Sequence, residues 1–189
     1  MSFGESEVPI RWKNMSKQTA GIAFSCAVAL AFSGWASTSD PMIAKGDRSK
    51  NEAAIRELID GFVKAIRAKD INGVMSVFAP EVVSFDLTPP MQHGGGKSFV
   101  KRWQDLFGAY SGPVDYEVRD LSIIAGDDVA FSHSLNRISG TMNDGQKTER
   151  WLRWTACYLK TNGKWLIAHE QVSVPVDLKS GTAALDLRP

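Results

Sequence analysis

Cysteine is scarce in this sequence, because only Cys26 and Cys157 occur among 189 residues. Two cysteines imply no disulfide framework, so burial of apolar side chains has to hold the fold together. Charge of one sign is also lacking, since 22 basic and 21 acidic residues leave a formal net charge of +1. So small a charge provides no bulk attraction for nucleic acid or for an anionic membrane. We expect neither as a partner.

Histidine is equally rare, and the sequence shows no motif for a metal or another cofactor. His93, His133 and His169 lie far apart, without the close spacing of a ligand pair. The segment 94–98, GGGKS, is like the end of a phosphate-binding loop, but Met91 stands where that loop requires glycine. No serine or cysteine lies in a nucleophile-elbow pattern. We therefore expect no cofactor and no metal.

Long hydrophobic runs are absent except near the N-terminus. There, Met15-Ser-Lys precedes the uncharged run TAGIAFSCAVALAF and a small-residue cleavage pattern that ends at Ala36. This order predicts a secretory signal peptide at residues 15–36, after an upstream extension at 1–14, and hence export to the periplasm or the medium. The run is short for a bilayer span, so we expect no stable membrane span after cleavage. A retained N-terminal anchor is the alternative.

Apolar residues are plentiful, at 43% of the chain with 10% aromatic, which is enough for one sizeable core. Helical spacing of apolar positions predicts three helices: one that begins at the capping box Ser49–Glu52, one that Asp70 caps and Pro80 ends, and one over Lys97–Tyr110. Strands are expected at Glu81–Leu87, Val114–Ala125, Val129–Gly140, Lys147–Lys160 and Lys164–Val176. These elements predict a linker at 37–48, one domain at 49–176 and a weakly patterned tail at 177–189.

Three helices followed by a run of antiparallel strands predict an α+β fold. We expect a cone, in which the N-terminal helices pack on a curved, mostly antiparallel sheet and enclose a pocket. The last two strands also carry apolar residues on the face away from that pocket. A face of that kind is normally covered, so we expect a homodimer through the convex face of the sheet.

The last two strands form a hairpin around Asn162-Gly163, a pair that tolerates the positive φ angles of a tight turn. One face of the second strand is apolar first and polar afterwards. Its alternate positions are Trp165, Ile167, His169, Gln171 and Ser173. This pattern is typical of a pocket floor. We therefore predict that His169, Gln171 and Ser173 line the pocket.

Two residues are candidates for acid/base chemistry. Asp86 follows apolar neighbours on the first strand, and burial there would raise its pKa and suit it to act as a base. The alternative is a carboxylate that caps the next loop or pairs with an arginine. His169 is a candidate for the acid or for a group that orients the ligand. The alternative is a buried histidine that is hydrogen-bonded to a neighbour.

The remaining pocket candidates depend on which face each strand presents. With a two-residue turn, Trp154 and its alternate neighbours lie across from the polar positions of the last strand. A longer turn brings Arg153 across instead, where it could bind a carboxylate. His133 and Asn136 lie on opposite faces of one strand, so at most one of them faces the pocket. Trp103 on the third helix is either core or pocket wall.

The stretch AKDINGVMSVFAPEVVSFDLTP, residues 68–89, resembles the second helix and first strand of the nuclear transport factor 2-like superfamily. It is most similar to the branch of ketosteroid isomerase and the SnoaL-like polyketide cyclases. A second likeness, to the last hairpin of the superfamily, lies in Asn162-Gly163-Lys164-Trp165 followed by His169, Ser173 and Pro175. The association domain of calcium/calmodulin-dependent kinases is also similar. The resemblance covers roughly residues 49–176.

The resemblance implies a pocket for an apolar small molecule and cofactor-free acid/base chemistry of an isomerase, cyclase or hydrolase type. The general-base aspartate of the isomerases falls on Asp86. Their oxyanion-hole tyrosine falls on Phe62, and their protonated aspartate falls near Thr155–Cys157, so both donors for an enolate are lacking at these positions. Steroid isomerisation by that mechanism is therefore not expected. The alternative is a non-catalytic domain that binds a ligand or associates with itself.

Overall fold

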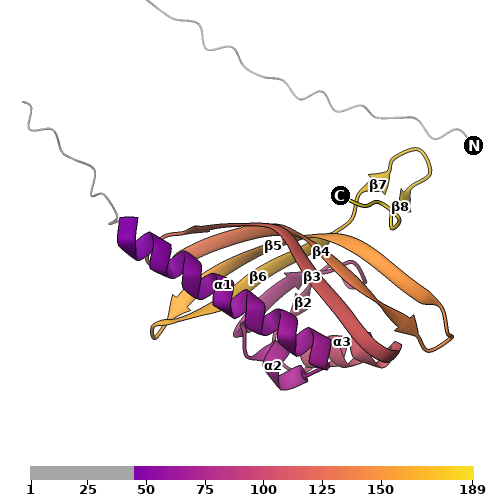
Figure 1. The fold of residues 1–189 in the computed structure, drawn as a ribbon, viewed down its shortest axis with the longest axis horizontal. Coiled ribbons are helices and arrows are strands. Elements are labelled where there is room, and N and C mark those ends of the chain that lie inside the picture. Colours follow the sequence, from indigo (N-terminus) through magenta and orange to yellow (C-terminus); the bar gives the residue numbers. More distant parts are fainter. Residues whose placement is uncertain (1–44) are drawn as a thin grey trace, which may run out of the picture. The chain divides into compact units, whose positions relative to one another are not determined.

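The computed structural model describes residues 45–189, so the predicted signal peptide at 15–36 and Cys26 lie outside the described residues. The described part has the predicted α+β composition (Figure 1). Its helices are α1 (Lys45–Ala68), α2 (Ile71–Met75) and α3 (Lys97–Gly108). Its strands are β1 (Phe78–Phe85), β2 (His93–Gly94), β3 (Tyr110–Ala125), β4 (Val129–Met142), β5 (Lys147–Thr161), β6 (Lys164–Ser173), β7 (Val176–Asp177) and β8 (Thr182–Ala183).

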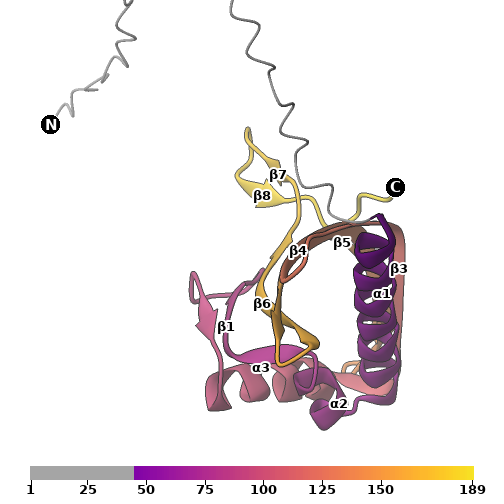
Figure 2. The ribbon, with the colours of Figure 1, turned by 90° about the vertical axis from the view of Figure 1, so that its left-hand side faces the viewer.

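Six of these strands form one sheet in the order β2-β1-β6-β5-β4-β3. The β1–β6 pair is parallel, and every other neighbouring pair in this sheet is antiparallel. Figure 2 shows the sheet curving from β3, which lies beside α1, round to β1, with α2 and α3 across one end. The predicted curved, mostly antiparallel sheet with three helices packed on it is confirmed.

Helix α1 buries one stripe of its surface, as its spacing predicts. Ile55, Ile59, Phe62 and Ile66 are buried, and they recur at intervals of three or four residues. The expected start was wrong, because α1 begins at Lys45 and the capping-box residues lie within the helix.

Helix α2 is also shorter than expected. It ends at Met75, and Phe78 already opens β1. The reason is tertiary, since the Ile167 amide donates a hydrogen bond to the Val77 carbonyl and draws this segment to the sheet.

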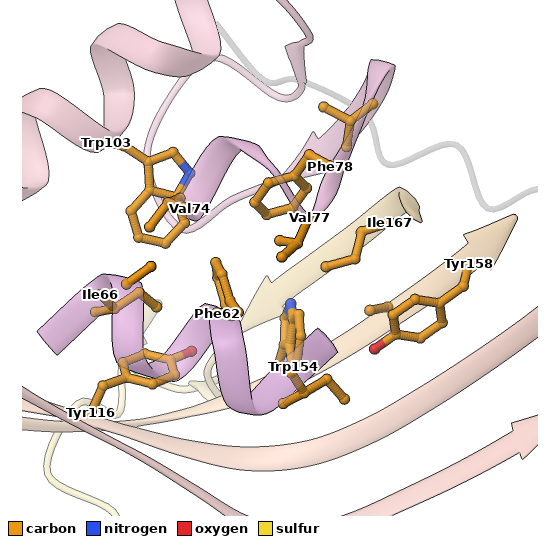
Figure 3. Close-up of a cluster of buried hydrophobic side chains, with 14 of the residues drawn as sticks. Phe62, Ile66, Val74, Val77, Phe78, Trp103, Tyr116, Trp154, Tyr158 and Ile167 are labelled. Atoms are coloured by element: carbon orange, nitrogen blue, oxygen red, sulfur yellow. The ribbon is translucent and has the colours of Figure 1, made fainter. Parts of the chain in front are cut away.

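The core between the helices and the sheet is aromatic (Figure 3). Phe62 lies at its centre, with ring centroids 5.6 Å from both Phe78 and Trp103 in edge-on contacts and 5.7 Å from Trp154 in a stacked contact. Such contacts add to the stabilisation that comes from burial of the rings. The position that the isomerase resemblance assigns to a tyrosine is therefore part of a packed cluster.

The β5–β6 hairpin turns at Asn162-Gly163 as predicted, and its turn has two residues, the shorter of the two lengths that the sequence left open. Thr161 pairs with Lys164, and φ is positive at Asn162 and Gly163. Further along, Tyr158 pairs with Ile167, but the next residue, Cys157, pairs with His169. Ala168 is therefore an extra residue on β6, a β-bulge. Because side chains alternate between faces, this extra residue exchanges the two faces of β6 from that point onward.

The bulge corrects the prediction for the pocket floor. Trp165 and Ile167 are buried on the inner face before it, and Glu170 is buried on that face after it. His169, Gln171 and Ser173 turn to the outer face instead. The same shift decides whether Arg153 faces the pocket. Arg153 pairs with Ser173 and is exposed on the outer face.

The outer face of the sheet carries a group of exposed apolar side chains, which we call the outer apolar patch: Ile124, Val129, Phe131 and Leu159. Ile124 pairs with Phe131, and Val129 pairs with Leu159, so these side chains adjoin one another across three strands. The residues after Asp177 are also part of the folded domain. Strand β8 pairs with β7, and Ala183 and Leu185 line the cavity that is described in the next section.

Candidate functional site

The concave side of the sheet encloses a cavity of about 790 Å³. Side chains from α1, α3 and most strands of the sheet line it. Apolar side chains contribute most of the lining surface, and they are Phe62, Leu87, Pro89, Trp103, Leu106, Ile138, Leu152, Trp154, Val172, Val174, Ala183 and Leu185. The polar lining residues come from several elements, and Asp86, Arg102 and Glu170 lie where β1, β6 and α3 meet. The cavity therefore has largely apolar walls and a polar end.

Glu170 is the most buried ionisable group at that polar end, with only 2% of its surface exposed. Ser84 Oγ donates to Glu170 Oε1 at 2.9 Å, and Trp154 Nε1 donates to Oε2 at 2.9 Å. Burial raises the pKa of Glu170, and this effect outweighs the charge of Arg102 and the two hydrogen bonds. The side chain is therefore a carboxyl group that retains its proton to higher pH than an ordinary glutamate.

Asp86 lines the same cavity but forms an ion pair with Arg102 of α3. The two side chains are 8% and 15% exposed, respectively. Burial by itself raises the pKa of Asp86. The hydrogen bond and the charge of Arg102 lower the pKa by more than burial raises it, so the net pKa lies below the ordinary value. The prediction of a raised pKa was wrong, and the alternative of an arginine partner is observed.

A chain of hydrogen bonds supplies a third polar group in the wall. Ser134 Oγ donates to Asn136 Oδ1 at 2.7 Å, and Asn136 Nδ2 donates to the Tyr116 hydroxyl at 2.8 Å. Burial raises the pKa of Tyr116, so the phenol retains its proton. The Asn136 bond uses the phenol oxygen as an acceptor, which leaves the phenol proton for an acceptor in the cavity.

Four of the nine predicted site residues line the cavity, namely Asp86, Trp103, Asn136 and Trp154. The other five do not, and they are His133, Arg153, His169, Gln171 and Ser173. His169 instead hydrogen-bonds through Nδ1 to the Val83 carbonyl at 2.8 Å and packs against Phe85. His133 is exposed, and Asn136, on the opposite face of β4, is the one of that pair that turns inward.

The sequence analysis missed Glu170, Arg102 and Tyr116. Glu170 had a signal, because it is the only charged residue among the apolar positions that alternate on its side of β6. Arg102 had one too, since it lies three residues after the buried Phe99 and beside Trp103, at the edge of the apolar stripe of α3. Tyr116 had no signal that separates it from a core aromatic residue.

Within residues 45–189, no three histidine, cysteine, aspartate or glutamate side chains lie close enough together to hold a metal ion. In the same part of the chain, no helix combines the length and the apolar character needed to cross a membrane.

Comparisons with known proteins agree with this architecture. The family model of the SnoaL-like domain matches residues 55–177. A nuclear transport factor 2-like protein of unknown function from Pseudomonas putida is 31% identical, with a TM-score of 0.68 over 75% of this chain and 98% of that one. No curated protein matches the sequence.

Two further solved structures share the fold at lower identity. One is a nuclear transport factor 2 superfamily protein from Salmonella enterica, at 18% identity and a TM-score of 0.61 over 69% of this chain and 94% of that one. The other is a ketosteroid isomerase-like protein from Erwinia carotovora, at 19% identity and a TM-score of 0.57 over 66% of this chain and 95% of that one.

The raised pKa of Glu170 predicts a pH dependence of stability. Above the ordinary glutamate pKa of about 4.3, the unfolded chain loses this proton while the folded chain keeps it, so stability falls as pH rises. We expect the free energy of unfolding of the wild type, relative to Glu170→Gln, to decrease from that pH up to the folded pKa, by at most about 1.4 kcal/mol per pH unit. Urea unfolding over a pH series measures it.

The control is Glu81→Gln, which changes an exposed glutamate and should follow the wild-type curve. Asp86 has the opposite effect, because its lowered pKa makes the folded protein less stable as pH falls. This effect is the same in all three proteins and cancels when their curves are compared. Parallel curves for the wild type and Glu170→Gln would contradict a buried, protonated Glu170.

Proposed function

This chain belongs to the SnoaL-like family and has the nuclear transport factor 2-like fold, and from that premise we propose that it binds an apolar small molecule in the cavity of its cone. The observation that supports this most is the cavity itself, which is sizeable and has a largely apolar surface with Asp86, Arg102 and Glu170 at one end. Its volume lies within the range of about 300–1,000 Å³ that is typical of small-molecule sites.

The shape of the walls favours a flat, cyclic ligand. Trp103, Trp154 and Phe62 bring aromatic rings to the lining from two helices and one strand. Aromatic faces of this kind pack well against another ring system. The polar end then orients the ligand, because buried donors and acceptors require partners there.

The test of binding uses 2-acetylnaphthalene, a neutral fused-ring ketone, and the fluorescence of the cavity tryptophans. We expect saturable quenching in the wild type and a loss of affinity of about tenfold or more in Val172→Trp, which fills the cavity. The matched control is Val129→Trp, at an exposed position of the outer apolar patch, which should bind as the wild type does. Equal affinity in all three proteins would contradict binding in the cavity.

A second candidate function, cofactor-free acid/base catalysis, is favoured by one specific observation. An ionised carboxylate, Asp86, and a carboxyl group with a raised pKa, Glu170, line the same cavity. Two titratable groups whose surroundings move their pKa values apart are typical of acid/base sites. Glu170 replaces His169 as the acid in this proposal, because His169 lies on the outer face.

Two hydrogen-bond donors for an enolate are lacking at the positions that the isomerase resemblance implies, but neighbouring elements supply donors in their place. The Tyr116 ring lies against Phe62, with centroids 6.2 Å apart, and brings a hydroxyl group to the cavity. Glu170 pairs directly with Ala156, within the stretch where the protonated aspartate of the isomerases falls. Asp86 would then remove a proton next to a carbonyl group, and Tyr116 and Glu170 would donate to the enolate oxygen.

The catalytic proposal predicts exchange of the methyl protons of 2-acetylnaphthalene for deuterium in heavy water, followed by NMR. We expect the wild type to accelerate this exchange and Asp86→Asn or Glu170→Gln to lower the rate by about a hundredfold or more. His169→Gln, on the outer face, serves as the control and should retain the rate. A wild type that binds the ketone without accelerating exchange would leave the domain as a non-catalytic ligand carrier.

We also propose that two copies associate through the outer apolar patch. The support is its exposure, with Phe131 43% and Ile124 54% exposed on adjoining strands. Apolar side chains that cluster on a sheet surface are typical of an interface. Cys157 pairs with Phe131, and His169 pairs with Cys157 on the next strand, so both would be covered as well.

Sedimentation tests the association. We expect the wild type to sediment as a dimer and Phe131→Glu to sediment as a monomer, because a buried unpaired charge is costly. Leu178→Glu, which changes a side chain 94% exposed outside the patch, should remain dimeric. A wild type that is monomeric at every concentration would contradict the proposal.

Export is a further proposal, and it is based on the sequence pattern of residues 15–36. An exported protein that has lost this segment would keep Cys157 as its single thiol. This residue is free and partly exposed on the outer face of the sheet.

A further inference from the structure

We propose that the small molecule of this cavity carries a carboxylate on its apolar body and that Arg102 binds this carboxylate. The inference rests on the proposed function, since it names the class of ligand for the same cavity. It goes beyond that function by assigning the charge of the ligand and the side chain that recognises it.

Arg102 has hydrogen-bonding capacity that the surrounding protein does not use. Its Nε donates to Asp86, whereas its Nη1 is buried and has no hydrogen-bond partner among the residues that the structure describes. A buried donor without a partner is costly, and most buried donors in proteins are satisfied. Since Arg102 lines the cavity, a ligand oxygen there would supply the missing acceptor.

The guanidinium group is also held in position before any ligand binds. Its carbon lies 5.0 Å from the centroid of the Trp103 ring and 5.7 Å from that of Phe99, both on α3, while Asp86 fixes the Nε edge. A planar guanidinium matches the two oxygens of a carboxylate, and pre-positioning reduces the entropy lost on binding.

The charges of the lining leave room for one anion. Lys101, Arg102 and Arg150 are the lysine and arginine residues of the lining, and Asp86 and Asp105 are its aspartates, while burial raises the pKa of its one glutamate, Glu170. Lys101 pairs with Asp105 and Arg102 with Asp86, so each of these anions already has its cation. Arg150 forms no ion pair within the described residues, so the lining holds one arginine without a carboxylate partner. An anionic ligand restores the balance.

The experiment compares 2-naphthoate with 2-naphthamide, which have the same ring system and differ in charge. Calorimetric titration near neutral pH should show the wild type binding naphthoate about tenfold or more tightly than the amide. Arg102→Met should remove this preference. Because that variant leaves Asp86 buried without a cation, the double variant Asp86→Asn/Arg102→Met is measured as well, and it should also bind the two compounds equally.

The matched control is Arg56→Met, which removes an exposed arginine of α1 and should keep the preference for naphthoate. A wild type that binds both compounds equally would overturn this inference and leave the proposed function standing. Binding of neither compound would overturn both. A preference that persists in the double variant would also overturn the inference, since another cation would then be responsible.

Discussion

The β-bulge at Ala168 is the constraint on which the site depends. Before it, Trp165 and Ile167 close the core, and after it the inner face of β6 presents Glu170 and then Val172 to the cavity. Without the extra residue, the polar positions of the strand would lie inside and Glu170 would lie outside. Because of this one inserted residue, a single strand contributes first to the packed core and then to the wall of the cavity.

Only one of the two carboxyl groups at the buried end of the site forms an ion pair. Arg102 forms an ion pair with Asp86, and its hydrogen bond and charge lower the pKa of that carboxylate. Glu170, which is more deeply buried and has Ser84 and Trp154 as its hydrogen-bond donors, has a raised pKa instead. Two carboxyl groups of similar intrinsic acidity thus have pKa values shifted in opposite directions in one cavity, because only one of them forms an ion pair.

Aromatic packing explains why a shared fold does not imply a shared mechanism here. Phe62 lies at the centre of a cluster with Phe78, Trp103 and Trp154 and brings no hydroxyl group to the cavity. The phenol and the carboxyl group that line the cavity come from β3 and β6. Fold similarity therefore establishes the cone, and the chemistry has to be derived from these side chains.

The sequence alone determined the α+β architecture, the buried stripe of α1 and the position of the Asn162-Gly163 turn. Those features follow from local periodicity and turn chemistry, which neighbouring residues carry. Only the tertiary structure decided that His169 turns outward, that Glu170 turns inward and that Arg102 pairs with Asp86. The physical reason is that a one-residue bulge reverses the faces of a strand without altering its composition, and that a pKa depends on partners far away in the chain.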